Sequence, residues 1–178
     1  MFTKQWDAVW LTHISQQSVP GSFCKNISGA QRTISTSYTQ YMTVLGGTNS
    51  TSGSSTDFNR LVKPNGTYGG VFIGTGNTPP TYEDYAPSGD FITTFEYTCV
   101  LTKTNTDKGI QLSSKFTITN TGTEAFTIGE VGLITSSGNS ANQSTKIMLE
   151  RTVLDTPITI EAGGVGQLTY TININMPS

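Results

Sequence analysis

The sequence predicts an all-β protein, an antiparallel β-sandwich of the jelly-roll or immunoglobulin-like kind with an N-terminal arm. One observation is composition: only 12% of the 178 residues are charged and 34% are hydrophobic, while Ser, Thr and 19 Gly are abundant. Thr suits a pleated, half-buried surface, and Gly and Ser suit turns. A second observation is that apolar and polar residues alternate in several segments beyond residue 70, which is the period of a strand with one buried face. A third is that turn signals recur about every 8–12 residues, as in sandwiches.

The first part of the chain differs in texture from the rest. We assign residues 1–56 to an N-terminal arm with a Gly/Ser/Thr-rich linker, and residues 57–178 to the sandwich, because residues 46–56 contain no apolar side chain. Apolar residues near the N-terminus recur at helix-like spacing: Trp6, Val9, Trp10, Leu11 and Ile14. The spacing fits a short amphipathic helix, or an arm that docks through both tryptophans; an edge strand that covers the core fits equally well.

Strand signals become regular after this boundary. Residues 70–74 form a short apolar run closed by glycine, and residues 91–103 and 110–119 alternate with a period of two. Residues 105–109 supply Asn, Asp and Gly for a tight loop, so these two alternating segments are predicted to pair antiparallel.

Further turns divide the C-terminal third. A turn at 120–124 precedes apolar residues up to Leu133, and another turn, 161–164, precedes the alternating segment 168–174. Between them we expect separate strands at 147–154 and 158–160, which brings the total from residue 70 to about seven or eight. No long helical pattern interrupts them, so a parallel βαβ layout is not expected.

Catalytic residues are not apparent. The chain has one histidine, His13, whereas nucleophilic triads and common zinc sites need more, and no cofactor or metal is expected. Paired carboxylates could support glycoside hydrolysis. The candidates are Glu83 with Asp84, Glu96, Glu130 and Glu150. Arg151 is an obvious mate for Glu130 or Glu150, so we interpret these glutamates as ion-pair partners that close one sheet onto the next, and we predict no enzyme.

The two cysteines, Cys24 and Cys99, are too few for a disulfide scaffold. We expect two unpaired, partly buried thiols, with a bridge between them as the alternative.

Charge and hydropathy limit the partners. The net charge is −2 and the ten basic residues are scattered, so nucleic-acid binding is not expected. No apolar run approaches the roughly 20 residues of a membrane-spanning helix. The first seven residues do not resemble a secretory signal, so we expect a protein made in a cytoplasm and kept or assembled there.

The segment 78–85, TPPTYEDY, predicts an extended stretch that enters a one-turn elbow anchored by Tyr82 and Tyr85. The preceding 74–78 contains glycines but lacks the Lys-Ser/Thr ending of a phosphate-binding loop. Clustered tyrosines on a loop could also form a sugar-binding or protein-binding platform.

Three segments together resemble small virion proteins of tailed bacteriophages. Residues 71–85, VFIGTGNTPPTYEDY, are similar to their GTGxTPPTxxDY segment, and residues 116–133, FTITNTGTEAFTIGEVGL, to their strand pair ending in EvGL. Residues 149–164, LERTVLDTPITIEAGG, are similar to their closing hairpin. The resemblance spans residues 70–175 and leaves out the N-terminal segment.

This resemblance implies a head decoration protein, a fibre protein or a tail accessory, located in the virion and made in the host cytoplasm. It implies no catalytic residue. The expected partners are other capsid or tail subunits and further copies of this chain. Trp6 and Trp10 are the predicted anchors to a neighbouring subunit, because tryptophan is enriched at interface hot spots. In the alternative function, a carbohydrate- or receptor-binding module, Tyr82 and Tyr85 would form the contact surface.

Overall fold

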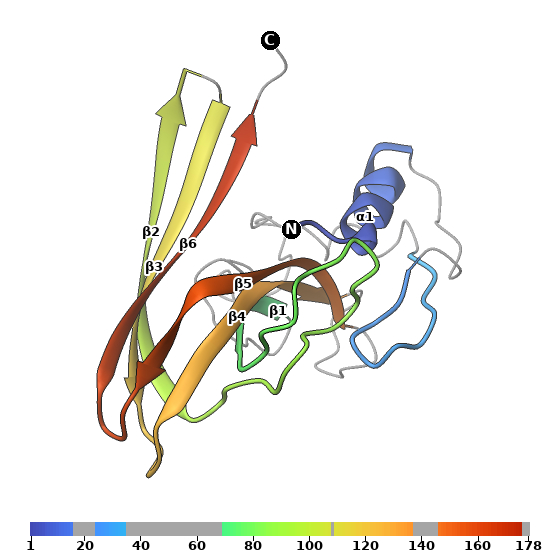
Figure 1. Ribbon diagram of the computed structural model, residues 1–178. Coiled ribbons are helices and arrows are strands. Elements are labelled where there is room, and N and C mark those ends of the chain that lie inside the picture. The colour runs from blue at the N-terminus through green and yellow to red at the C-terminus, as the bar shows by residue number, and fades with distance from the viewer. Residues whose placement is uncertain (16–23, 35–68, 108, 137–145, 176–178) are drawn as a thin grey trace, which may run out of the picture.

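The computed structural model describes residues 1–15, 24–34, 69–107, 109–136 and 146–175 (Figure 1). These residues form one helix and six strands. In chain order they are α1 Lys4–Ser15, β1 Gly69–Gly74, β2 Phe95–Thr106, β3 Gly109–Asn120, β4 Phe126–Ser136, β5 Lys146–Ile160 and β6 Val165–Asn175. The predicted all-β antiparallel sandwich is confirmed.

The six strands form two three-stranded sheets with the orders β1-β4-β5 and β2-β3-β6. All neighbouring strands are antiparallel. The predicted pairing across 105–109 is confirmed, because β2 and β3 run side by side from Phe95 opposite Asn120 to Thr106 opposite Gly109. The turns 120–125 and 161–164 carry the chain from one sheet to the other. Residues 149–164, which were compared with a closing hairpin, therefore lead from one sheet of the sandwich to the other.

Two predicted strand boundaries were wrong. Strand β2 begins at Phe95, and Phe91 instead forms an isolated bridge with Gly74. The segments 147–154 and 158–160 belong to one strand, β5, which explains why fewer strands form than expected. The pairing of β5 jumps from Val153, opposite Glu130, to Ile158, opposite Ile128. Pro157 lies in this irregular stretch, where its missing N–H costs no regular ladder hydrogen bond.

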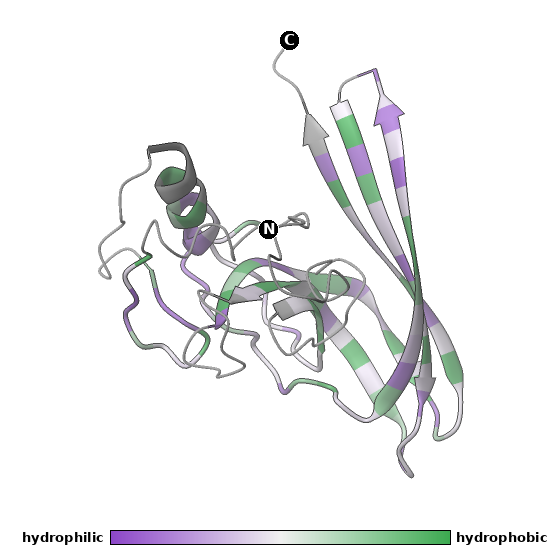
Figure 2. Ribbon diagram, turned by 180° about the vertical axis from the view of Figure 1, so that it is seen from behind, coloured by the Kyte–Doolittle hydropathy of each residue, from purple (hydrophilic) through white to green (hydrophobic). Residues whose placement is uncertain are grey.

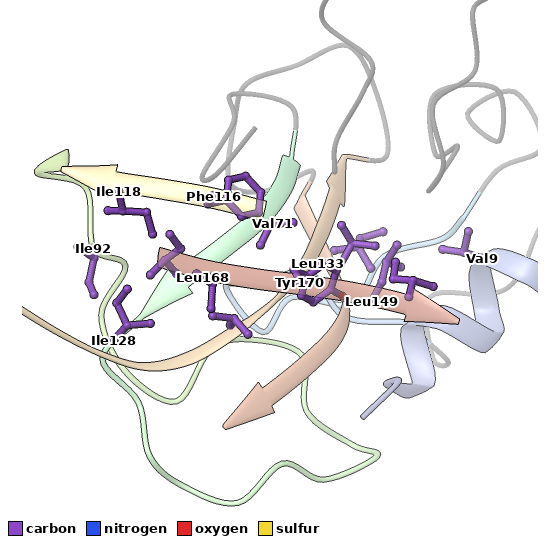
Figure 3. Packing of buried hydrophobic residues seen from close by; sticks show 14 of the residues in the cluster. Val9, Val71, Ile92, Phe116, Ile118, Ile128, Leu133, Leu149, Leu168 and Tyr170 are labelled. Carbon is purple, nitrogen blue, oxygen red and sulfur yellow. The ribbon is translucent and has the colours of Figure 1, made fainter. Parts of the chain in front are cut away.

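The core lies between the two sheets and continues under α1 (Figure 3). Among the buried side chains are Val71, Phe116, Leu133, Leu149 and Leu168. The N-terminal part contributes to the same cluster through Ala8, Val9, Cys24 and Ile34. Of the two open alternatives for the apolar residues 6–14, the structure shows the helix, and before it Phe2 makes one isolated bridge with Glu150 of β5. The predicted boundary between residues 56 and 57 lies outside the described residues.

The β2-β3-β6 sheet extends well beyond the other sheet (Figure 1). Along its strands hydrophilic and hydrophobic positions alternate, as a sheet with two different faces requires (Figure 2). Within the described ranges, no helix is long and apolar enough to cross a membrane.

Candidate functional site

Arg151 of β5 is the centre of a buried ion-pair network. Its Nε donates to Glu130 Oε2 at 2.6 Å, and its Nη1 donates to Asp84 Oδ2 at 2.6 Å. Its Nη2 donates to the carbonyl oxygen of Thr78 at 2.5 Å. Arg151 is 2% exposed and Glu130 is fully buried. A buried charge of this kind is tolerated only when its hydrogen bonds are well satisfied, which is the case here.

Glu130 also holds the loop that precedes β2. Its Oε1 accepts the Gly89 N–H at 2.8 Å, and its Oε2 accepts the N–H and hydroxyl of Ser88, both at 3.2 Å. The close approach requires glycine at 76, since a Cβ there would lie 2.2 Å from Glu130 Oε1. The glycines of 74–78 therefore make room for a carboxylate of the chain itself, in a loop that looked superficially like a phosphate-binding one.

Asp84 is the more accessible carboxylate of the network. Burial alone would raise its pKa, but hydrogen bonds from the Thr81 hydroxyl and N–H and from Arg151 outweigh burial and lower the pKa. The Thr81 hydroxyl donates to Asp84 Oδ1 at 2.7 Å and its N–H donates to Oδ2 at 2.9 Å. The elbow 81–84 is thus a tight turn closed by its own aspartate and clamped onto Arg151.

A second network surrounds Glu150. Its Oε2 accepts the Tyr170 hydroxyl at 2.7 Å, and its Oε1 accepts the Thr152 hydroxyl at 2.5 Å and the amino group of Met1 at 2.8 Å. Burial, and then the nearby Glu150 charge, raise the pKa of Tyr170 well above its ordinary value. A cavity of about 390 Å³ lies beside this network, lined in part by Phe2 and Leu154.

These contacts correct the expected role of the two glutamates. Glu130 and Arg151 lie on neighbouring strands of one sheet, β4 and β5, so their ion pair does not join the sheets. It binds that sheet to the loop carrying Asp84 and Ser88. A link between the sheets comes instead from Glu150 on β5 through Tyr170 on β6.

Asn120 ties the two crossing turns together. Its Nδ2 donates to the carbonyl oxygens of Glu124, at 2.8 Å, and Ile160, at 3.0 Å, and its Oδ1 accepts the Gly122 N–H at 2.8 Å. Its backbone N–H donates to the Gly164 carbonyl at 2.9 Å. Because Asn120 is 1% exposed, water cannot replace these bonds.

The carboxylates considered for glycoside hydrolysis differ in their surroundings. Glu130 and Glu150 are buried and hold the contacts just described, while Glu83 lies on the surface, where it pairs with Lys4 at 3.3 Å. Glu96 is exposed on β2. In the part of the chain that the structure describes, no group of three or more His, Cys, Asp or Glu could hold a metal ion.

The predicted interface residues separate into two places. Helix α1 docks on the 81–85 elbow: the Lys4 N–H donates to the Tyr82 carbonyl at 2.8 Å, and the Tyr82 hydroxyl donates to Asp7 at 2.6 Å. Trp6 is half-buried and stacks on Phe2 with ring centroids 4.2 Å apart. Trp6 and Tyr82 therefore belong to one assembled unit, α1 with the elbow.

Tyr85 faces a different neighbour, since Lys25 Nζ lies 5.0 Å from the centre of its ring. The backbone of Trp10 and His13 lies in α1, but their side chains are outside the described part of the structure. Both cysteines are free, as the interpretation of two unpaired thiols expected. Burial raises the pKa of Cys24 to about 12.

Sequence reasoning missed one surface feature, the outer edge of β2. Tyr97 is 39% exposed and Val100 is 65% exposed, and both lie on this edge strand. The alternation of residues 91–103 indicated a strand, but a pattern within one strand does not reveal whether the strand has one neighbour or two.

Comparison of the chain with protein-family models, with curated proteins and with solved structures finds no match.

Proposed function

We propose that this chain is a non-enzymatic structural protein of a tailed bacteriophage, which decorates or completes the capsid or tail through subunit contacts. The observation that supports the proposal is that all three segments resembling phage virion proteins meet in the buried network around Arg151, and that two of them meet again around Asn120. Thr78 and Asp84 come from the first segment, Glu130 from the second and Arg151 from the third.

The contacts of Asn120 join the second and third of these segments again. Asn120, from the segment 116–133, exchanges backbone hydrogen bonds with Gly163 and Gly164, from the segment 149–164. Gly132 of the EVGL motif has the carbonyl oxygen of Glu150 against its backbone, where an added Cβ would lie 2.1 Å away. Residues that carry the resemblance therefore contact one another in the fold. Such contacts are expected if the segments belong to one common fold, and they are not expected from a chance match of turn patterns.

Burial of the glutamates and the exposed sheet edge favour an assembly role. The two buried glutamates and the arginine are engaged in holding loops and sheets together, and apolar side chains remain on β2 for contact with other subunits. In this proposal the partners are capsid or tail subunits and further copies of the chain, and the protein is made in the host cytoplasm before it enters the virion.

Immunogold electron microscopy tests the proposal. Antibodies against the recombinant protein are applied to phage particles purified from an induced lysate of the source bacterium. Regular label on heads or tails is the expected result. If an immunoblot detects the protein in the lysate while purified particles carry neither label nor band, the virion role is wrong.

A carbohydrate- or receptor-binding module is the second candidate, favoured by the exposure of Tyr82, at 48%. A glycan array probed with the full chain and with Tyr82→Ala tests it. Tyr82→Phe is the matched control, because it keeps the ring and removes only the hydroxyl that donates to Asp7. Binding that Tyr82→Ala abolishes and Tyr82→Phe retains would support this candidate, and absence of binding would reject it.

A further inference from the structure

Strand β2 has a neighbour on one side only. It pairs with β3 along its whole length, and within the described ranges no strand pairs with its other side. In Figure 1 this side is the outer border of the projecting sheet, away from α1 and the N-terminus. Half of its backbone N–H and C=O groups therefore point outward from the sheet, as a template for another strand.

Both borders of the β1-β4-β5 sheet are partly covered. The border of β5 is paired with the first residues, because the Thr3 N–H donates to Leu149 O and the Arg151 N–H donates to Met1 O, both at 3.0 Å. The border of β1 is met by residues 90–92, where the Ile92 N–H donates to Ile73 O at 3.0 Å. Strand β6, the other border of the projecting sheet, pairs with β3 alone among the described strands, and it differs from β2 in that its residues 168–173 line the cavity that Met1 and Phe2 also line.

The β2 edge also carries exposed apolar side chains among its polar ones, which is unusual for an edge that must stay solvated. Within Phe95–Thr106, the exposed Tyr97 and Val100 lie on opposite faces of the sheet, and Cys99 and Leu101 are only partly buried. A strand border with apolar side chains on both faces and unpaired backbone groups is a typical site for strand addition.

We propose that two copies of this chain pair through their β2 strands, antiparallel and about a two-fold axis that passes between the two Val100 residues. The two sheets of the order β2-β3-β6 then become one continuous six-stranded sheet, with the two β2 strands at its centre. The inference deepens the homo-oligomer part of the proposed function by naming the strand and its register.

The sequence of β2 is complementary to itself in this register. Residues whose numbers sum to 200 lie opposite each other on the same face, so the most exposed apolar side chain of the strand, Val100, meets its own copy. Thr98 faces Thr102 of the partner subunit, a pair of β-branched residues that suits an antiparallel ladder. Tyr97 faces Lys103 of the partner subunit, which brings an ammonium group to an exposed aromatic ring.

Charges are compatible with the same register. Glu96 lies opposite Thr104 of the partner subunit, so no residue of β2 faces a like charge. A two-fold axis is also the commonest symmetry of homo-oligomers, because one self-complementary patch is sufficient. The pairing removes the exposed edge and buries Val100 at its centre.

Light scattering of the full chain tests the pairing. The wild-type protein is expected to have twice the mass of one 19.1 kDa chain, and Val100→Lys is expected to have the mass of one chain. Two lysines would meet at the axis in that variant, whereas the fold should persist because residue 100 is largely exposed. Lys115→Ala is the matched control: residue 115 is exposed opposite Val100 but lies on the inner strand β3, so the dimer should remain.

Cross-linking tests the register. Under mild oxidation Val100→Cys should give a disulfide-linked dimer on non-reducing gels, while Lys115→Cys and the wild-type chain should stay uncross-linked. A monomeric wild-type chain, a dimer that persists in Val100→Lys, or a Val100→Cys chain that does not cross-link would each overturn the proposal.

The outcome is independent of the particle experiment. Labelled particles together with a monomer in solution would reject the β2 pairing alone. A β2-dependent dimer together with unlabelled particles would reject the virion role alone.

Discussion

Replacement of Glu130 should destabilise the protein more than replacement of any exposed carboxylate. Glu130→Ala removes four hydrogen bonds: one from Arg151, two from Ser88 and one from Gly89. It also leaves the guanidinium group of Arg151, which is 2% exposed, with one carboxylate partner, Asp84, instead of two. Removing one partner of a buried ion pair costs about 3–5 kcal/mol of folding free energy.

The size of the effect can be stated as a melting temperature. For a chain of this length about 1 kcal/mol shifts the midpoint by roughly 2–4 °C, so Glu130→Ala should lower it by about 6–20 °C. Glu130→Gln keeps the shape and one acceptor oxygen but loses the charge, and we expect a smaller loss of about 1–3 kcal/mol. Circular dichroism during thermal and urea unfolding measures both variants.

Glu161→Gln is the matched control, because Glu161 is an exposed glutamate whose contact with the 161–164 turn is made by its backbone. Its free energy of unfolding should stay within about 0.5 kcal/mol of the wild-type value. If Glu130→Ala remained as stable as Glu161→Gln, the network around Arg151 would not hold the fold together, and the assigned role of the motif residues would be wrong. A Glu130→Gln chain of wild-type stability that lost a measured glycosidase activity would instead revive the catalytic reading.

Three further predictions concern the rest of the fold. Asn120→Ala should lower the free energy of unfolding by about 1–3 kcal/mol in urea titrations, because it leaves the buried carbonyl group of Ile160 without the Asn120 donor. Asn77→Ala, at an exposed position, should change it little. The lowered pKa of Asp84 means that its charged form stabilises the fold. This contribution is complete above the unfolded pKa of about 4 and is lost as the pH falls through the folded pKa. Asp84→Asn should therefore reduce the loss of folding free energy between about pH 5 and 2, as measured by urea titration. Cys24 should react with a thiol reagent at pH 7.5 only after urea is added, since burial raises its pKa to about 12. Rapid reaction of Cys24 in the folded protein would contradict its placement in the core. Cys99, which is more accessible, serves as the comparison.

The fold class could be predicted from the sequence because strand formation leaves a local signal. The alternation of β2 and β3 and the Asn, Asp and Gly residues between them specify two antiparallel strands from neighbouring residues alone. Strand β5 could not be predicted in the same way. Its continuity through Pro157 depends on an irregular pairing with β4 that only the packed sheet reveals.

The candidate site was predictable only in part, for a similar reason. Sequence reasoning identified Arg151 as a mate for Glu130 or Glu150, because buried opposite charges need each other. It did not find Asp84, Thr78 and Ser88 as the remaining partners, since these contacts span 42–73 positions along the chain. The hydrophobic periodicity of a strand does not indicate which distant loop packs over that strand.

The sequence by itself determined that this is an antiparallel β protein, because periodicity and turn residues act over a few positions. The tertiary structure alone decided that the N-terminal segment is a helix packed into the core and bridged to β5 through Phe2, and that the glycine-rich loop encloses Glu130. It alone decided that β2 is a border strand with Val100 exposed. These features depend on which surfaces meet when the chain folds, and the free energy of such contacts belongs to pairs of residues far apart in the chain.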